Sequence, residues 1–167
     1  MKKILSLTLA LAMLGTALTG CGSKTAAPET SVEPTQQTAP YQQEQSQTEK
    51  ALALINTFAT GDTDTARSLL SDGYIQHNLA YGTGADAFIA SVEYLASADV
   101  KTTVNNIRAF EDGDKVFLQT IYNFAGAGEQ VAFDIFRFDE DGKIAEHWDV
   151  METIADQSTW QNQNGKF

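Results

Sequence analysis

Residues 134–150, DIFRFDEDGKIAEHWDV, concentrate ionisable side chains in a short stretch of the chain. Apolar and polar residues alternate on both sides of residues 139–142, and this pattern predicts two strands joined by a tight turn. Carboxylates and imidazoles are the groups that most often transfer protons in enzymes. The predicted hairpin is therefore the first candidate for a functional site.

The turn geometry predicts which side chains of the hairpin share a face. If residues 139–142 form a type I turn with Gly142 in a left-handed bulge, Phe138 lies opposite Ile144 and Asp134 lies opposite Trp148. Side chains then alternate between two faces. The first face holds Asp134, Phe136, Phe138, Ile144, Glu146, Trp148 and Val150. Aromatic and aliphatic residues with isolated carboxylates are typical of a ligand cavity, so we expect this face to form a pocket with Phe136, Phe138, Glu146 and Trp148 in its wall.

The second face is too apolar for open solvent and too charged for a core. It holds Phe133, Ile135, Arg137, Ala145, His147 and Asp149. Such a mixture favours a subunit interface, so we expect a homodimer built through Phe133, Ile135, Arg137, His147 and Asp149.

Asp134 and His77 are the candidate catalytic residues. A carboxylate among aromatic side chains is placed to act as general acid or base, although Asp134 would also suit a bond to a helix end or a neighbouring strand. His77, within YIQHN at residues 74–78, would donate a hydrogen bond to a developing oxyanion. Alternation places His77 with Ile75 rather than with Tyr74, so a structural role for this histidine stays open.

We expect neither a metal nor another cofactor. The chain has 2 histidines, far apart in sequence, and none of the short-spaced ligand pairs of zinc motifs. Neither a Ser-His-Asp nor a Cys-His nucleophile signature is present.

The first 20 residues have the pattern of a secretory signal peptide, with Lys2 and Lys3 before an apolar run at residues 4–18. The run ends in LTGC, which resembles the lipobox of bacterial lipoproteins. We therefore expect Cys21 to be lipidated and the mature protein to be exported and anchored to the cell membrane or envelope. Residues 21–47 are rich in Ala, Pro, Thr, Glu and Gln without apolar periodicity, which predicts a flexible tether.

Residues 48–167 have the length of one domain. Apolar spacing predicts three helices. The first ends before Gly61, the second ends before Gly73, and the third follows Gly84. Alternation predicts strands at residues 74–78, 101–110, 115–124, 129–138 and 143–151. Helices followed by an antiparallel meander indicate an α+β fold.

The charge of the chain argues against some partners. Lys and Arg total 11 against 22 Asp and Glu, for a formal net charge of −11. Such a chain repels phosphate backbones and anionic lipid head groups, so nucleic acid is not an expected partner.

The motifs YIQHN and FDIFRFDEDGKIAEHWDV resemble those of the SnoaL-like branch of the nuclear transport factor 2-like superfamily. This resemblance implies a cone-shaped α+β barrel, with N-terminal helices packed on a curved antiparallel sheet around a deep apolar pocket. The superfamily includes polyketide cyclases, isomerases, dehydratases and epoxide hydrolases, and also proteins that only bind ligands. This sequence departs from the family at Leu79, where a proline is expected, and at Gln119, where relatives often carry a histidine that would serve as a pocket base.

Two functional hypotheses follow. The first is an enzyme that binds a small apolar or carbonyl-bearing molecule and transfers a proton without a cofactor, in an aldol-type cyclisation, isomerisation or hydrolysis. The second is a non-catalytic ligand-binding or assembly module with the same pocket, because fold alone does not decide between them.

Overall fold

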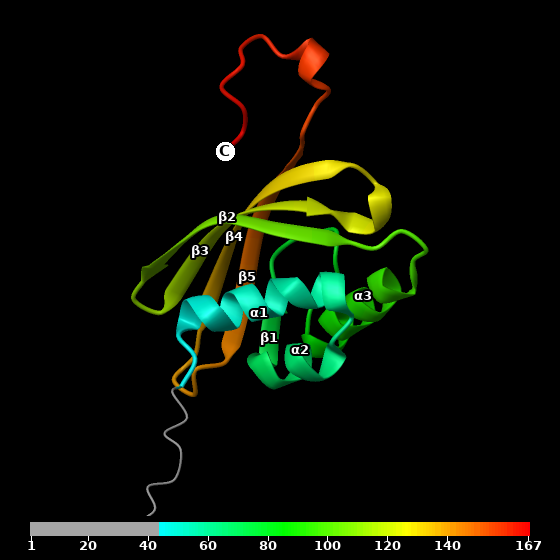
Figure 1. Ribbon diagram of the computed structural model, residues 1–167. Coiled ribbons are helices and arrows are strands. Elements are labelled where there is room, and N and C mark those ends of the chain that lie inside the picture. The colour runs from blue at the N-terminus through cyan, green and yellow to red at the C-terminus, as the bar shows by residue number, and fades with distance from the viewer. Residues whose placement is uncertain (1–43) are drawn as a thin grey trace, which may run out of the picture. The chain divides into compact units, whose positions relative to one another are not determined.

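The structure is a computed structural model that describes residues 44–167 (Figure 1). The predicted signal peptide, the lipidation site Cys21 and most of the predicted tether lie outside the described residues. The described chain has a mixed α+β fold with helices packed on a curved sheet, as the sequence predicts. None of its helices combines the length and the apolar character needed to cross a membrane.

Helix α1 (Gln47–Thr60) has defined ends. The hydroxyl of Ser46 accepts a hydrogen bond from the backbone N–H of Glu49, and the Glu49 carboxylate accepts one from the N–H of Ser46. This capping box satisfies donors that the first turn leaves free. Gly61, with φ of 74°, ends the helix in the left-handed conformation. The last residues of the predicted tether, Ser46 and Gln47, therefore belong to the folded domain.

Two shorter helices complete the helical layer. Helix α2 (Thr63–Leu69) begins at Asp62, whose carboxylate accepts a hydrogen bond from the N–H of Thr65. Helix α3 (Ala85–Ser97) follows Gly84. The apolar sides of α1 and α3 are buried in the core through Ala51, Leu54, Ile55, Phe88, Ile89 and Val92.

The sheet has five strands in the order β1-β5-β4-β3-β2. They are β1 (Leu70–Gln76), β2 (Thr103–Asp112), β3 (Lys115–Asn123), β4 (Glu129–Phe138) and β5 (Ile144–Thr153). Strands β2 to β5 form the predicted antiparallel meander, whereas β1 pairs in parallel with β5. This parallel pairing places the end of β1, including Gln76, directly beside the candidate hairpin.

The turn between β4 and β5 has the predicted geometry. The N–H of Gly142 donates to the carbonyl of Asp139 at 3.0 Å, Gly142 has φ of 68°, and Phe138 pairs with Ile144. One residue further from the turn the register shifts, so that Arg137 of β4 pairs with Glu146 of β5 instead of Ala145. Ala145 is thus an extra residue, a β-bulge in β5.

This bulge overturns the predicted pairing beyond the turn. Asp134 pairs with Asp149, and Trp148 pairs with Ile135 instead of Asp134. Because side chains alternate along a strand, one extra residue moves every later side chain of β5 to the opposite face. His147 and Asp149 therefore share the concave face with Asp134, and their assignment to the outer face was wrong.

The C-terminal segment, with a short 3₁₀ helix at Gln157–Thr159, returns to the outer face of the sheet. The side-chain amide of Gln119 donates to the carbonyl of Lys166 at 2.8 Å, and the Lys166 ammonium pairs with Glu152 at 2.6 Å. Gln119 is therefore bonded outside the sheet. Its difference from the family histidine does not remove a base from the cavity.

Candidate active site

A cavity of about 600 Å³ lies between the concave face of the sheet and helices α1 and α3. Its wall is mostly aromatic and aliphatic. The apolar part includes Ile55, Phe58, Phe88, Leu95, Phe124, Phe136 and Met151. The polar residues of the lining are Gln76, Ser91, Gln130, Asp134, His147 and Asp149, together with four tyrosines. An apolar enclosure with a few convergent polar groups is the usual form of a small-molecule site.

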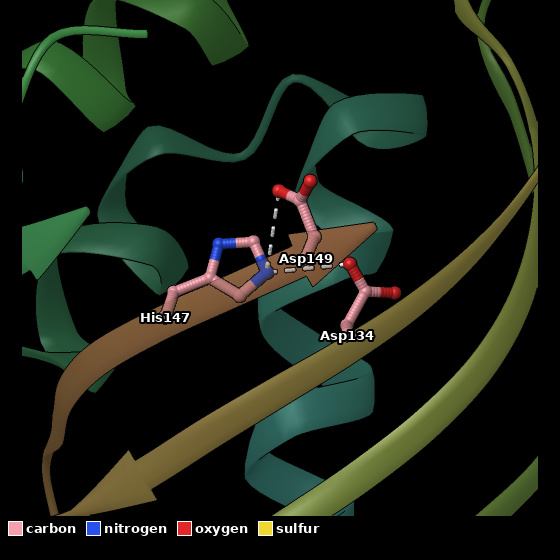
Figure 2. A group of neighbouring side chains, drawn as sticks. All are labelled: Asp134, His147 and Asp149. Atoms are coloured by element: carbon pink, nitrogen blue, oxygen red, sulfur yellow. Dashed lines mark hydrogen bonds and ion pairs between the residues drawn. The ribbon is translucent and has the colours of Figure 1, made fainter. Parts of the chain in front are cut away.

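Asp134, His147 and Asp149 gather on one part of the wall, with Asp134 on β4 and the other two on β5 (Figure 2). Nε2 of His147 lies 3.2 Å from Oδ1 of Asp134 and 3.9 Å from Oδ2 of Asp149. All three side chains are at most 8% exposed. We call these residues the Asp-His-Asp cluster.

Neighbouring side chains hold the cluster in place. The hydroxyl of Tyr122 donates to Oδ2 of Asp134 at 3.0 Å, and the Asn78 amide donates to Oδ1 of Asp149 at 2.7 Å. The ring of Phe136 stacks on His147 with centroids 4.4 Å apart. Each member of the cluster is thus oriented by a contact from outside it, which is the arrangement that a preorganised site requires.

The hydrogen bonds of Gln76 determine the tautomer of His147. The backbone N–H of Asn78 donates to Oε1 of Gln76 at 2.9 Å, so the Gln76 NH₂ group faces the imidazole. It lies 3.0 Å from Nδ1 of His147. An amide NH₂ can only donate, so Nδ1 accepts and the ring proton resides on Nε2, between the two carboxylates.

The same bond decides how well the cluster would suit a metal ion. The three ligand atoms lie within 4.8 Å of one another, and no other such group occurs in residues 44–167. A histidine that binds metal through Nε2 normally donates its Nδ1–H to an acceptor. Here Nδ1 faces a donor, so the cluster is built to hold a proton rather than a metal.

Burial alters the acid–base behaviour of the groups around the cluster. Loss of hydration raises the pKa of the Asp149 carboxyl, and the charge of Asp134 acts in the same direction, against the opposing effects of His147 and Asn78. Burial also raises the pKa of Tyr122 far above its ordinary value, so this hydroxyl stays a donor. Asp149 therefore holds a proton to higher pH than an ordinary aspartate.

The sequence of residues 51–147 matches the family model of the SnoaL-like domain. The chain belongs to the SnoaL-like domain family. No functionally curated protein matches its sequence.

Solved structures resemble this SnoaL-like domain at low sequence identity. An NTF2-like protein of unknown function from Cytophaga hutchinsonii is 16% identical with a TM-score of 0.57, over 66% of this chain and 94% of that one. A proposed polyketide cyclase from Bacillus cereus is 15% identical with a TM-score of 0.55, over 64% and 74% of the two chains. An LEH-like epoxide hydrolase from M. tuberculosis is 18% identical with a TM-score of 0.54, over 62% and 80%. At these identities the likeness establishes the fold.

The SnoaL-like domain places only part of the predicted site in the cavity. Asp134 and Phe136 line it. Phe138 is buried in the core without reaching the cavity wall. Glu146 and Trp148 lie on the outer face because of the bulge at Ala145, so their assignment to the pocket was wrong.

His77 also lies on the outer face. Its ring stacks on Trp148 with centroids 4.4 Å apart, and its Nε2 lies 2.9 Å from Oε2 of Glu146. Glu146 in turn accepts from Nε of Arg137 at 2.6 Å. The expectation that His77 assists Asp134 was therefore wrong.

Sequence reasoning missed His147 and Asp149 as cavity residues, together with their partners Gln76, Asn78 and Tyr122. One signal for the first two was present. Ile144 and Ala145 are consecutive small or apolar residues that interrupt the alternation of β5, and such an interruption is typical of a bulge.

We predict that Asp149→Asn stabilises the SnoaL-like domain near neutral pH. A folded-state pKa above the unfolded value means that stability falls as pH rises from the ordinary value of 3.8 through the raised pKa. Asparagine removes this cost and still accepts the Asn78 hydrogen bond. Thermal unfolding should show a Tm higher by a few degrees at about pH 7, with a smaller gain at about pH 4.

The matched control is Asp72→Asn, which changes an exposed aspartate of β1. It should leave Tm nearly unchanged at both pH values. An Asp149→Asn protein that is no more stable than the parent at neutral pH would contradict this account of Asp149.

Proposed function

We propose that this SnoaL-like domain binds a small, largely apolar or carbonyl-bearing molecule in its cavity and transfers a proton on that molecule without a cofactor. The observation that carries the proposal is the Asp-His-Asp cluster on the wall of an apolar cavity. Two carboxylates flank one ring N–H, and an enclosed apolar site strengthens interactions among such groups.

The two carboxylates differ in their hydrogen bonds, and this difference suggests their roles. Asp134 accepts from Tyr122 and from His147 and remains a proposed general acid or base. Asp149 accepts only from Asn78 among the described residues, which leaves Oδ2 free to take a proton from a bound molecule. Abstraction of a proton from carbon next to a carbonyl is the shared first step of aldol-type cyclisation and of many isomerisations.

The test uses exchange of carbon-bound hydrogen for deuterium. The domain of residues 44–167 is incubated in D₂O with a panel of apolar cyclic ketones such as 1-tetralone. Mass spectrometry then measures deuterium incorporation next to the carbonyl of the ketone. We expect exchange above the background rate, and a loss of about a hundredfold or more in both Asp134→Asn and Asp149→Asn. Each asparagine keeps the shape of the side chain and removes its titration.

Asp72→Asn serves as the matched control and should exchange at the parental rate. Binding of the ketones without catalysed exchange would contradict the catalytic proposal and favour the non-catalytic ligand-binding or assembly module.

We further propose that the domain forms a homodimer through the outer face of the sheet. Support comes from apolar side chains that face solvent on adjacent strands. Phe133 and Val150, which pair across β4 and β5, are 55% and 73% exposed, and Phe110 and Phe117, which pair across β2 and β3, are 63% and 37% exposed. Ile135 and Arg137 belong to the same face, whereas His147 and Asp149 do not. Adjacent apolar side chains of this kind are typical of a protein interface.

We predict that Phe133→Glu dissociates this dimer, because a charge at the centre of an apolar contact would be buried without a partner. Sedimentation equilibrium at tens of micromolar should give a dimer for the parent and a monomer for the variant. Leu79→Glu, at a fully exposed loop residue, should leave the dimer intact. A monomeric parent would rule the interface out.

We also propose that a lipid on Cys21 anchors the protein to the cell membrane or envelope, with the signal peptide and lipobox pattern as support. Cys21→Ser removes the chain's only cysteine and the thiol that would accept the lipid. We predict that this variant leaves the membrane fraction or accumulates with residues 1–20 attached. Membrane fractionation measures the first outcome and mass spectrometry of the N-terminal peptide measures the second, and a parental chain that starts elsewhere than residue 21 would refute the anchor.

A further inference from the structure

The charged side chains that line the cavity are all acidic. They are Asp134 and Asp149, and neither Lys nor Arg of residues 44–167 takes part in the lining. Arg137, which lies on β4 like Asp134, points to the outer face and pairs there with Glu146. A ligand with a carboxylate or phosphate would therefore meet two buried acids and no compensating cation. Like charges in an enclosed site cost far more than in water, so the lining disfavours anionic ligands.

Asp149 has an acceptor that the protein leaves unused. Its side chain is 6% exposed, and Oδ1 accepts from Asn78. Oδ2 accepts no hydrogen bond from any residue of the described part of the chain, and its distance of 3.9 Å from Nε2 of His147 is too long for one. Figure 2 shows this carboxylate beside the imidazole. Because Asp149 lines the cavity, this oxygen can accept a hydrogen bond from a molecule that occupies the cavity.

Aromatic rings surround the remaining space. Phe58, Tyr74, Phe88 and Phe124 line the cavity, and all four lie in ring–ring contacts. Tyr81 and Tyr94 also line it while 49% and 74% exposed, so they lie where the cavity meets solvent. The face of an aromatic ring attracts cations and repels anions. The apolar wall and the acidic groups therefore favour the same kind of ligand.

We propose that the cavity selects a small apolar molecule carrying a protonated amine, whose ammonium group donates to Oδ2 of Asp149. A neutral hydroxyl could donate a hydrogen bond to the same oxygen, but only a cation also offsets the negative charge of the two aspartates. The proposal rests on the proposed binding of an apolar molecule in this cavity. It does not depend on proton transfer.

The experiment compares three probes that share a naphthalene body and differ in charge. They are 1-naphthylmethylamine, which is protonated at neutral pH, the neutral 1-naphthylmethanol, and the anionic 1-naphthoate. Isothermal titration with the described domain should give a Kd for the amine at least about tenfold below that of the alcohol, because charge-assisted hydrogen bonds are about twice as strong as neutral ones. Naphthoate should bind more weakly than the alcohol.

Asp149→Asn should abolish the preference for the amine, because the carboxylate that favours an ammonium over a neutral hydroxyl is gone. Asp72→Asn should retain the preference. If the alcohol or naphthoate binds as tightly as the amine, the charge preference is overturned and the proposed apolar binding stands. If none of the probes binds, both are overturned. An amine preference that survives in Asp149→Asn overturns the role of Oδ2.

Discussion

A single extra residue in β5 determines the chemistry of the cavity. With Ala145 as a bulge, His147 and Asp149 turn toward the concave face, where Asp134 projects from β4. Without it, Glu146 and Trp148 would face inward and Asp134 would have no imidazole beside it. A bulge costs part of the ladder between two strands, but it re-aims every side chain that follows. The Asp-His-Asp cluster therefore forms at the expense of regular pairing between β4 and β5 at Ala145.

The polar residues around the cluster are needed because the cluster is buried. Two carboxylates removed from water are unfavourable unless donors surround them. Tyr122, Asn78 and the His147 ring supply those donors, and the N–H of Asn78 fixes Gln76, which in turn fixes the proton of His147. The stabilisation is incomplete at Asp149, whose pKa is raised by burial. Incomplete satisfaction of a buried acid is common at sites where a ligand or a reaction completes it.

Much of the fold follows from sequence patterns, and the failure of the predicted site has one physical origin. Alternation correctly predicts β4 at residues 129–138, and the Asp-rich turn with Gly142 has the predicted geometry. Within the hairpin, the consecutive Ile144 and Ala145 are the one sign of the bulge, and β5 also pairs on its other edge with β1, where the register shifts between Leu70 and Ile75. That pairing joins segments about 70 residues apart, and local patterns carry little information about such contacts. Alternation nevertheless predicted correctly which side chains share a face near the end of β1. Tyr74 and Gln76 line the cavity, whereas Ile75 and His77 lie on the other face.

The bulge also explains why the outer face carries its own ionic contacts. Trp148, turned outward, stacks on the ring of His77. The carboxylate of Glu146, also turned outward, bonds to both His77 and Arg137. The two histidines of the chain thus lie in opposite environments, since His147 on β5 is enclosed between acids and His77, just after β1, lies at the solvent boundary. Residue type and sequence motif alone do not distinguish them. The bulge turns His147 toward the cavity with Asp149 and turns Glu146 and Trp148 outward, whereas the alternation of β1 directs His77 to the outer face beside them.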